Sequence, residues 1–237
     1  MEKILYRAEE RGRADHGWLR AWHSFSFANY YHPEKINFGV LRVLNDDFIA
    51  PGGGFGEHPH DNMEIVTIPL SGSINHKDSM GNDILIREGE IQVMSAGSGI
   101  FHSEFNPSPT KELNLFQIWI IPDKRNVTPR YSQVSIKQLE CKNDFFQIVS
   151  PEEHDQGAWI HQNAWVSMGV FDENVTVNYS VKDKCNGVYL MVVEGEIELD
   201  GVVLKRRDAI GLKGSQRINL KSLATSKVLL LDVPMNI

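Results

Sequence analysis

The chain has 237 residues, of which 41% are hydrophobic and 23% charged, and it carries a formal net charge of −7 at pH 7. This length predicts one large domain or two small ones, and the acidic charge disfavours nucleic acid, which needs a basic face. No apolar run approaches the ~18 residues of a membrane-spanning helix and the N-terminus lacks a secretory core, so we expect a soluble, cytoplasmic protein with no membrane contact.

The first half of the chain reads as a series of β-strands. Its β-branched and aromatic runs are broken by Gly, Pro, Asn and Asp, and they cover residues 38–46, 64–78, 83–97 and 113–122. The stretch "DSMGND" at 78–83 predicts a hairpin turn, because its Met-Gly-Asn tip tolerates positive φ. Short strands with little helical periodicity favour an all-β sandwich or barrel.

A polar, proline-containing connection at 120–140 interrupts this pattern before strands resume. We therefore predict two domains, 1–135 and 136–237. The second half repeats the vocabulary of the first, and the two align with Gly195 beneath Gly72. Two copies of one β-fold are the economical interpretation.

Two pairs of potential metal ligands stand in the first half, His58-x-His60 and His102-x-Glu104. In an extended strand, residues i and i+2 point the same way, so each pair presents both side chains to one face. If the pairs face each other, they supply three imidazoles and one carboxylate. This set suits a divalent first-row metal with positions left open for water, O₂ or substrate.

The second copy has no such cluster. On the same register, the places of the first pair fall near Val181 and Asp183, and that of His102 falls near Asn219. Two histidines of the second half lie before its main strands: His154 and His161. We expect one metal ion per chain, bound by the first half.

Two features of the sequence predict ordinary surface chemistry. Cys141 and Cys185 stand far apart without a C-x-x-C spacing, which indicates reduced thiols. The basic run "KRR" at 205–207 is followed at once by Asp208, so we expect a solvated turn and not a phosphate clamp.

The segments "HPHDNME" and "GEIQVMSAGSGIFHSEFN" follow the two cupin motifs, although Ser95 replaces the usual proline of the second. Together with "HGWLRAWHSFSFANYYHPE", "HKDSMGN" and "LFQIWIIPD", they resemble the pirin family. The resemblance is densest from about residue 10 to 125. The remainder is similar to the C-terminal cupin of bacterial pirin-like proteins.

The resemblance to pirins implies an all-β bicupin, in which two β-barrel or jelly-roll domains of the double-stranded β-helix type pack face to face. It implies a metal, usually Fe(II), held by residues matching His58, His60, His102 and Glu104. Such ligands also accept Mn, Ni, Cu or Zn. Bacterial members are similar to quercetin 2,3-dioxygenases, which implies a flavonol and O₂ as substrates and carbon monoxide as a product.

Glu64 is the alternative carboxylate, because the glutamate of the first motif is a metal ligand in many other cupins. In pirins the "HSE" glutamate takes that role, so we expect Glu104 to be both the ligand and the base that accepts the flavonol proton. Glu64 would then lie behind the ligands or hydrogen-bond a ligand histidine. We expect three residues to form the apolar wall of the substrate pocket: Ile65, Val93 and Phe116.

The remaining histidines and aromatic residues have structural interpretations. We expect packing or surface positions for His23, His32 and His76, although His76 and Asp78 share a strand face that could border the pocket. We expect core and inter-domain packing for Phe25, Phe27, Tyr30 and Tyr31.

A second function stays open at this point, because the resemblance to pirins also implies a regulatory protein that senses metal or redox state and binds a partner protein. A cupin isomerase or epimerase is a weaker alternative, since we find no basic cluster suited to a sugar phosphate. We expect a monomer.

Overall fold

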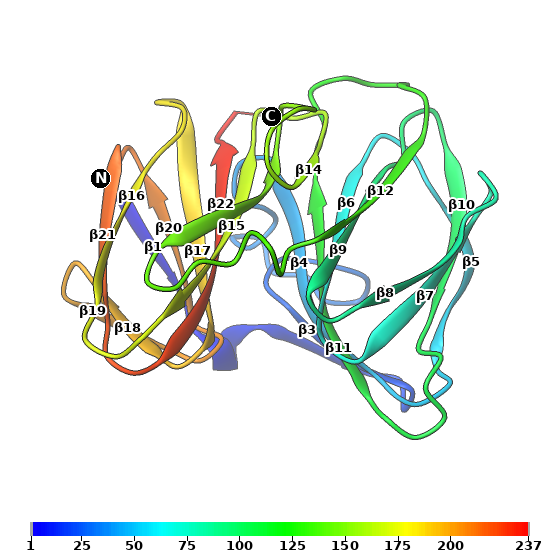
Figure 1. Ribbon diagram of the computed structural model, residues 1–237, viewed down its shortest axis with the longest axis horizontal. Helices are drawn as coiled ribbons and strands as arrows, with labels where there is room; N and C mark the ends of the chain where they lie inside the picture. Colours follow the sequence, from blue (N-terminus) through cyan, green and yellow to red (C-terminus); the bar gives the residue numbers. More distant parts are fainter. Residues whose placement is uncertain (1, 237) are drawn as a thin grey trace.

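The computed structural model describes residues 2–236, which form two β-barrels side by side (Figure 1). In this view the N-terminal barrel, largely cyan to green, lies on the right and the C-terminal barrel, yellow to red, on the left. Within these residues the helical structure is one short 3-10 turn, η1 (Ala8–Glu10). No helix of residues 2–236 is long and apolar enough to cross a membrane. The predicted all-β bicupin is confirmed.

The N-terminal barrel is made of two sheets. The larger has the order β12 (Arg130–Ser135), β9 (Glu90–Ser95), β6 (Glu64–Ser71), β11 (Leu113–Ile120), β4 (Leu41–Ile49), β3 (Leu19–His23) and β2 (Gly12–Asp15). The smaller has the order β5 (Gly54–His60), β10 (Ile100–Phe105), β7 (Ser73–Asp78) and β8 (Asp83–Arg87). The β7–β8 hairpin turns at Gly81, whose φ of 94° confirms the turn predicted at 78–83.

The C-terminal barrel repeats this arrangement. Its larger sheet has the order β1 (Glu2–Tyr6), β20 (Ala209–Lys213), β17 (Asn186–Glu194), β22 (Ser226–Pro234), β15 (Trp165–Phe171), β13 (Phe145–Ser150) and β14 (Ala158–Trp159). Its smaller sheet has the order β16 (Thr176–Ser180), β21 (Arg217–Ser222), β18 (Glu196–Leu199) and β19 (Val202–Lys205). Each barrel therefore has one seven-stranded and one four-stranded sheet, as expected for two copies of one fold.

Two glycines mark the same corner in each copy. Gly72 separates β6 from β7 with a φ of 82°, and Gly195 separates β17 from β18 with a φ of 86°. A side chain is strained at such angles, so glycine is favoured at both corners. The register that places Gly195 beneath Gly72 is therefore confirmed.

The N-terminal strand crosses to the other barrel. β1 pairs antiparallel with β20, from Glu2 opposite Lys213 to Tyr6 opposite Ala209. It occupies the edge position that β12 takes in the first large sheet. Residues 2–6 thus extend the C-terminal sheet, although the sequence places them within the predicted domain 1–135.

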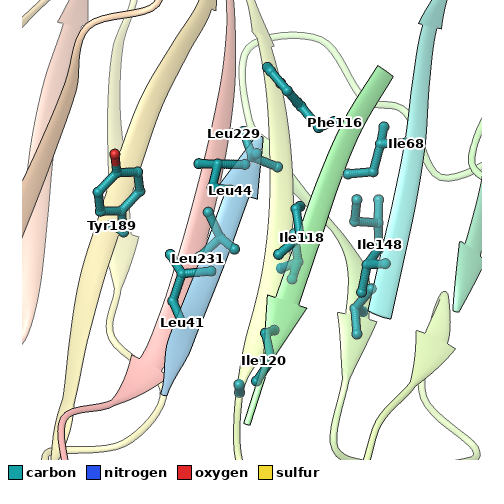
Figure 2. Close-up of a cluster of buried hydrophobic side chains, with 14 of the residues drawn as sticks. Leu41, Leu44, Ile68, Phe116, Ile118, Ile120, Ile148, Tyr189, Leu229 and Leu231 are labelled. Carbon is teal, nitrogen blue, oxygen red and sulfur yellow. The ribbon is translucent and has the colours of Figure 1, made fainter. Parts of the chain in front are cut away.

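The two large sheets pack face to face around a shared apolar core, which Figure 2 shows in close-up. Strand alternation explains which residues reach it: on β6, Val66 and Ile68 enter this core, whereas Ile65 packs with residues inside the first barrel. Phe25 reaches the same core, with its ring 5.5 Å from that of Tyr189 in the second barrel. The predicted inter-domain packing of Phe25 is confirmed.

A buried ion pair also joins the barrels. Arg207, at a φ of 67° in the turn before β20, donates from Nε to Asp46 Oδ2 at 2.7 Å. Arg11 donates to the same oxygen at 3.5 Å, and the Arg207 guanidinium lies 5.0 Å from the Phe116 ring centre. The prediction of a solvated turn at 205–207 is wrong for Arg207, because the positive φ directs it into the interface, where buried Asp46 requires a cation.

Candidate metal centre

The four predicted ligands lie on two neighbouring strands of the first small sheet. β10 pairs antiparallel with β5, and His102 is directly opposite His58. Along β10 the buried residues His102 and Glu104 alternate with the exposed Phe101 and Phe105, so the ligand side chains face into the barrel. A bulge between His102 and Glu104 shifts the register at this point.

Three imidazoles of these two strands lie close together. Potential ligand atoms of His58, His60 and His102 all lie within 4.8 Å of one another. The Nε2 atoms of His58 and His102 are 3.0 Å apart. Two nitrogens held ~2.1 Å from one ion at a right angle would be separated by about 3.0 Å, so this spacing fits a shared metal.

Hydrogen bonds orient these rings. His58 Nδ1 lies 2.8 Å from the Gly56 carbonyl oxygen, which accepts its proton and leaves Nε2 free as a ligand. Burial, and then the charge of neighbouring His58, lower the pKa of His60 to about 4 and that of His102 to about 2. Neutral imidazoles are the form that binds a metal.

His76 extends this network behind His102. Its Nε2 lies 2.9 Å from Asp78 Oδ2, and its Nδ1 lies 3.5 Å from His102 Nδ1. Asp78 thus accepts a hydrogen bond from His76 Nε2–H, and His76 Nδ1 can accept one from His102 Nδ1–H. The Nε2 atom of His102 is then left to bind a metal. His76 is fully buried in this network, so packing describes it better than a surface position.

Glu104 is buried beside these imidazoles. Its Oε2 accepts a hydrogen bond from Gln117 Nε2 at 2.9 Å, whereas its Oε1 has no partner among the described residues. Burial raises the pKa of Glu104 to about 7, although the hydrogen bond from Gln117 opposes that shift. Glu104 forms a second ligand group with His76 and His102, so His102 belongs to both groups. The buried Glu104 Oε1 lacks a hydrogen-bond donor in the described part of the chain, and a divalent cation bound at the shared His102 would supply a partner for it.

A cavity of about 380 Å³ opens beside the imidazoles. Its aromatic wall comes from four residues of different segments: Trp18, Phe27, Phe55 and Trp119. The Trp119 ring lies 4.9 Å from that of His60. Polar side chains of the same cavity include Asn45, Asp47 and Gln117.

The predicted apolar wall is wrong. Val93 and Phe116 belong to the core between the barrels, and Ile65 packs with Met94 and Ala96 away from the cavity. Phe27, for which core packing was expected, lines the cavity instead. The signal that could have found Trp119 is its i+2 spacing from Gln117 on β11, which places both on the inner face.

Glu64 lies outside the centre. Its Oε2 accepts a hydrogen bond from Ser95 Oγ at 2.7 Å, and Arg130 donates to the same Ser95 at 3.3 Å. Burial raises the pKa of Glu64 to about 7, although Ser95, Arg130 and the His161 backbone oppose that shift. Glu64 faces the second barrel because it shares the parity of Val66 on β6. The expected hydrogen bond from Glu64 to a ligand histidine is not among its contacts in residues 2–236.

The second barrel has an apolar interior where the first has imidazoles. On the corresponding strands the buried hydrophobic residues are Val177 and Tyr179 on β16 and Ile218 and Leu220 on β21, whereas Asn178 and Asn219 are exposed. β16 and β21 occupy the places of β5 and β10, and Asn219 on β21 pairs with Asn178. The partner position is thus three residues before the expected Val181. Within residues 2–236, the groups of three or more potential ligands are both in the first barrel.

Comparison with known proteins gives matches over most of the chain. The pirin family model matches residues 6–120, and the model of the quercetinase C-terminal cupin domain matches residues 147–233. A protein of Escherichia coli K12 named quercetin 2,3-dioxygenase is 42% identical over 231 residues, which cover 97% of this chain and 98% of the relative. A pirin-like protein of Caulobacter vibrioides is 39% identical, with 94% and 96% covered.

A solved structure shows the same fold. The Escherichia coli bacterial pirin YhhW, in complex with nickel(II), is 40% identical and superposes with a TM-score of 0.93 over 100% of both chains.

Proposed function

The chain belongs to the pirin family, and from that premise we propose that it is a metal-dependent dioxygenase that opens the heterocyclic ring of flavonols such as quercetin. The observation that carries the proposal is a cluster of three imidazoles, one of which, His102, also groups with the partly unsatisfied buried Glu104, next to an aromatic cavity lined by His58, His60 and Glu104. Relatives named quercetin 2,3-dioxygenase over nearly the whole chain support an oxidoreductase.

We assign the metal to His58, His60, His102 and Glu104. The 3.0 Å separation of His58 and His102 Nε2 and the unpaired Glu104 Oε1 support this set. We propose Fe(II) as the native ion, with Mn, Ni, Cu and Zn as alternatives that the same donors accept. The nickel in the Escherichia coli pirin structure is consistent with such tolerance.

The aromatic wall can bind a flat polyphenol. Trp119 and Phe27 meet edge to face with ring centres 5.3 Å apart, and Trp18 meets Phe55 at 5.0 Å. The cavity volume of about 380 Å³ falls in the ~300–1,000 Å³ range of small-molecule sites. Apolar faces next to the imidazoles would orient the substrate ring and exclude water from it.

Glu104 is the proposed base. Gln117 donates to Oε2 and Oε1 has no protein partner among the described residues, so the carboxylate would keep acceptor capacity for the proton of the flavonol 3-hydroxyl beside the metal. A bound cation would hold Glu104 ionised, and the ionised carboxylate is the form that can accept this proton. The metal, when bound, supplies Lewis acidity that favours the deprotonated flavonol and the redox chemistry that O₂ requires.

The overall reaction balances with one flavonol and one O₂. The C2–C3 and C3–C4 bonds break, C3 leaves as carbon monoxide, and both atoms of O₂ enter the depside product. The flavonol ring is oxidised and O₂ is reduced, so no further electron donor is needed.

The second candidate is a regulatory pirin that binds a partner protein. The observation that favours it lies on the outer face of β10, where Phe101 is 51% and Phe105 is 41% exposed. These rings alternate with His102 and Glu104, so the same strand carries apolar surface outside and proposed ligands inside. Full metal occupancy without turnover of any flavonol would favour this role.

Glu104→Gln tests the proposed base. We expect the amide to keep the size and one weak oxygen donor, so that some metal remains on the three histidines. At matched metal content, this variant should still bind flavonol but turn over at least ~100-fold more slowly. Near wild-type turnover would refute the role of Glu104 as the base.

A further inference from the structure

Asp47 is a carboxyl side chain of the cavity that is not one of the proposed metal ligands. Asn45 and Asp47 are two residues apart on β4 and both line the cavity, whereas Asp46 between them points into the barrel interface. Asp47 is only 4% exposed.

The carboxyl of Asp47 lacks a protein partner. Its Oδ1 is buried without a hydrogen bond, and within residues 2–236 no side chain donates to either of its oxygens. Burial, and then the charges of Asp46 and Glu104, raise its pKa well above the usual range. A buried carboxyl in this state destabilises the fold, so a role in stability does not explain it.

The neighbouring polar groups are satisfied in contrast. Asn45 Oδ1 lies 2.9 Å from His23 Nδ1. Gln117 accepts from Thr67 Oγ1 at 2.9 Å and donates to Glu104 at 2.9 Å. The Asp47 carboxyl therefore lacks a hydrogen-bond partner in the part of the chain that the structure describes, whereas its polar neighbours Asn45 and Gln117 have theirs.

We propose that Asp47 is a substrate-binding residue that hydrogen-bonds a second hydroxyl group of the flavonol, in addition to the one directed to Glu104. This rests on the proposed function and narrows its substrate class to planar polyphenols with at least two hydroxyls. A hydroxyl suits the site because it can donate to an ionised carboxyl and accept from a protonated one. The pairing thus holds in either state of Asp47.

The test measures flavonol affinity in metal-loaded protein without O₂, so that binding is separated from turnover. Quenching of the cavity residues Trp18 and Trp119 reports binding. The probes are 3-hydroxyflavone and derivatives that each add one hydroxyl. The variants are Asp47→Ala and the isosteric Asp47→Asn, with Asp83→Ala on the barrel surface as the matched control.

We expect one added hydroxyl to improve wild-type affinity at least ~5-fold, the size of a neutral hydrogen bond, so that the expectation does not depend on the ionisation of Asp47. Asp47→Ala should lose that gain while binding 3-hydroxyflavone within about 3-fold of wild type, and Asp47→Asn should keep part of it. Both variants should retain metal, and Asp47→Asn should unfold at a higher temperature than wild type. A residue with a merely structural role would give a lower unfolding temperature.

Three outcomes separate the claims. If every added hydroxyl acts equally in wild type and Asp47→Ala, the inference is overturned even when flavonols are turned over. If the hydroxyl effect depends on Asp47 but no turnover occurs, the inference stands and the proposed enzyme function falls. If wild type binds none of the probes, both are overturned.

Discussion

Replacing Glu104 by glutamine should change how the stability of the metal-free protein depends on pH. Burial raises the pKa of this carboxyl from 4.5 to about 7. The folded state then holds the proton more tightly than the unfolded state, so protonation stabilises the fold below about pH 4.5, and this contribution is lost as the pH rises through 7. At about 1.4 kcal/mol per unit of pKa, the whole contribution is roughly 3 kcal/mol. About 2 to 3 kcal/mol of it should disappear between pH 5 and pH 8.

Urea unfolding at these two pH values measures the effect. The unfolding free energy of wild type minus that of Glu104→Gln should fall by about 2 to 3 kcal/mol on going from pH 5 to pH 8. Glu64→Gln is the matched control, because the pKa of Glu64 is also about 7 but its carboxyl bonds Ser95 outside the centre. Without metal, both Glu104→Gln and Glu64→Gln should show this pH-dependent difference in unfolding free energy from wild type.

Metal loading should then distinguish the two carboxyls. A bound cation holds Glu104 ionised at both pH values, so with excess metal only Glu64→Gln should keep its pH-dependent difference. A Glu104→Gln difference that is equal at pH 5 and pH 8 in the metal-free protein would refute the reasoning about burial. A difference that persists after loading would contradict Glu104 as a ligand.

Three further substitutions test other parts of the molecule. Asp78→Asn should weaken metal binding ~10- to 100-fold in chelator competition, because His76 loses the acceptor that orients it; unchanged affinity would exclude that network. Asp46→Ala should lower the unfolding free energy by about 3 to 5 kcal/mol in urea, since Arg207 stays buried without its carboxylate; a loss below ~1 kcal/mol would contradict a buried pair. His161→Ala should leave the metal content at the wild-type value of about one ion per chain by elemental analysis. About two ions in wild type, with one lost in the variant, would contradict a single site in the first barrel.

The fold could be predicted to a large extent because its determinants are local. Strand alternation and the corner glycines Gly72 and Gly195 repeat in both halves, and each acts within a few residues. The crossing of β1 to β20 could not be predicted, since it joins segments about 200 residues apart and depends on which sheet edge is free. The strand at 130–135 was likewise hidden in a polar connection, because it pairs at the edge of its sheet.

The candidate site divides in the same way. His58-x-His60 and His102-x-Glu104 were visible because two-residue spacing on a strand fixes a shared face. The cavity wall was not, since Trp18, Phe27 and Trp119 come from separate segments that meet only in the folded barrel. Assigning a residue to the wrong face of its strand also led to errors. Neighbouring residues of a strand point to opposite faces, so Phe116 lies in the interface between the barrels and not on the cavity wall.

The most direct test of the central claim is the yield of carbon monoxide from flavonol. Protein purified without O₂ and loaded with Fe(II) to about one ion per chain should consume one O₂ and release one carbon monoxide for each quercetin opened, and His102→Ala, which we expect to lose most of its metal, should release almost none. Fully metal-loaded wild type that releases no carbon monoxide from quercetin or any other flavonol would contradict the dioxygenase and favour the regulatory role.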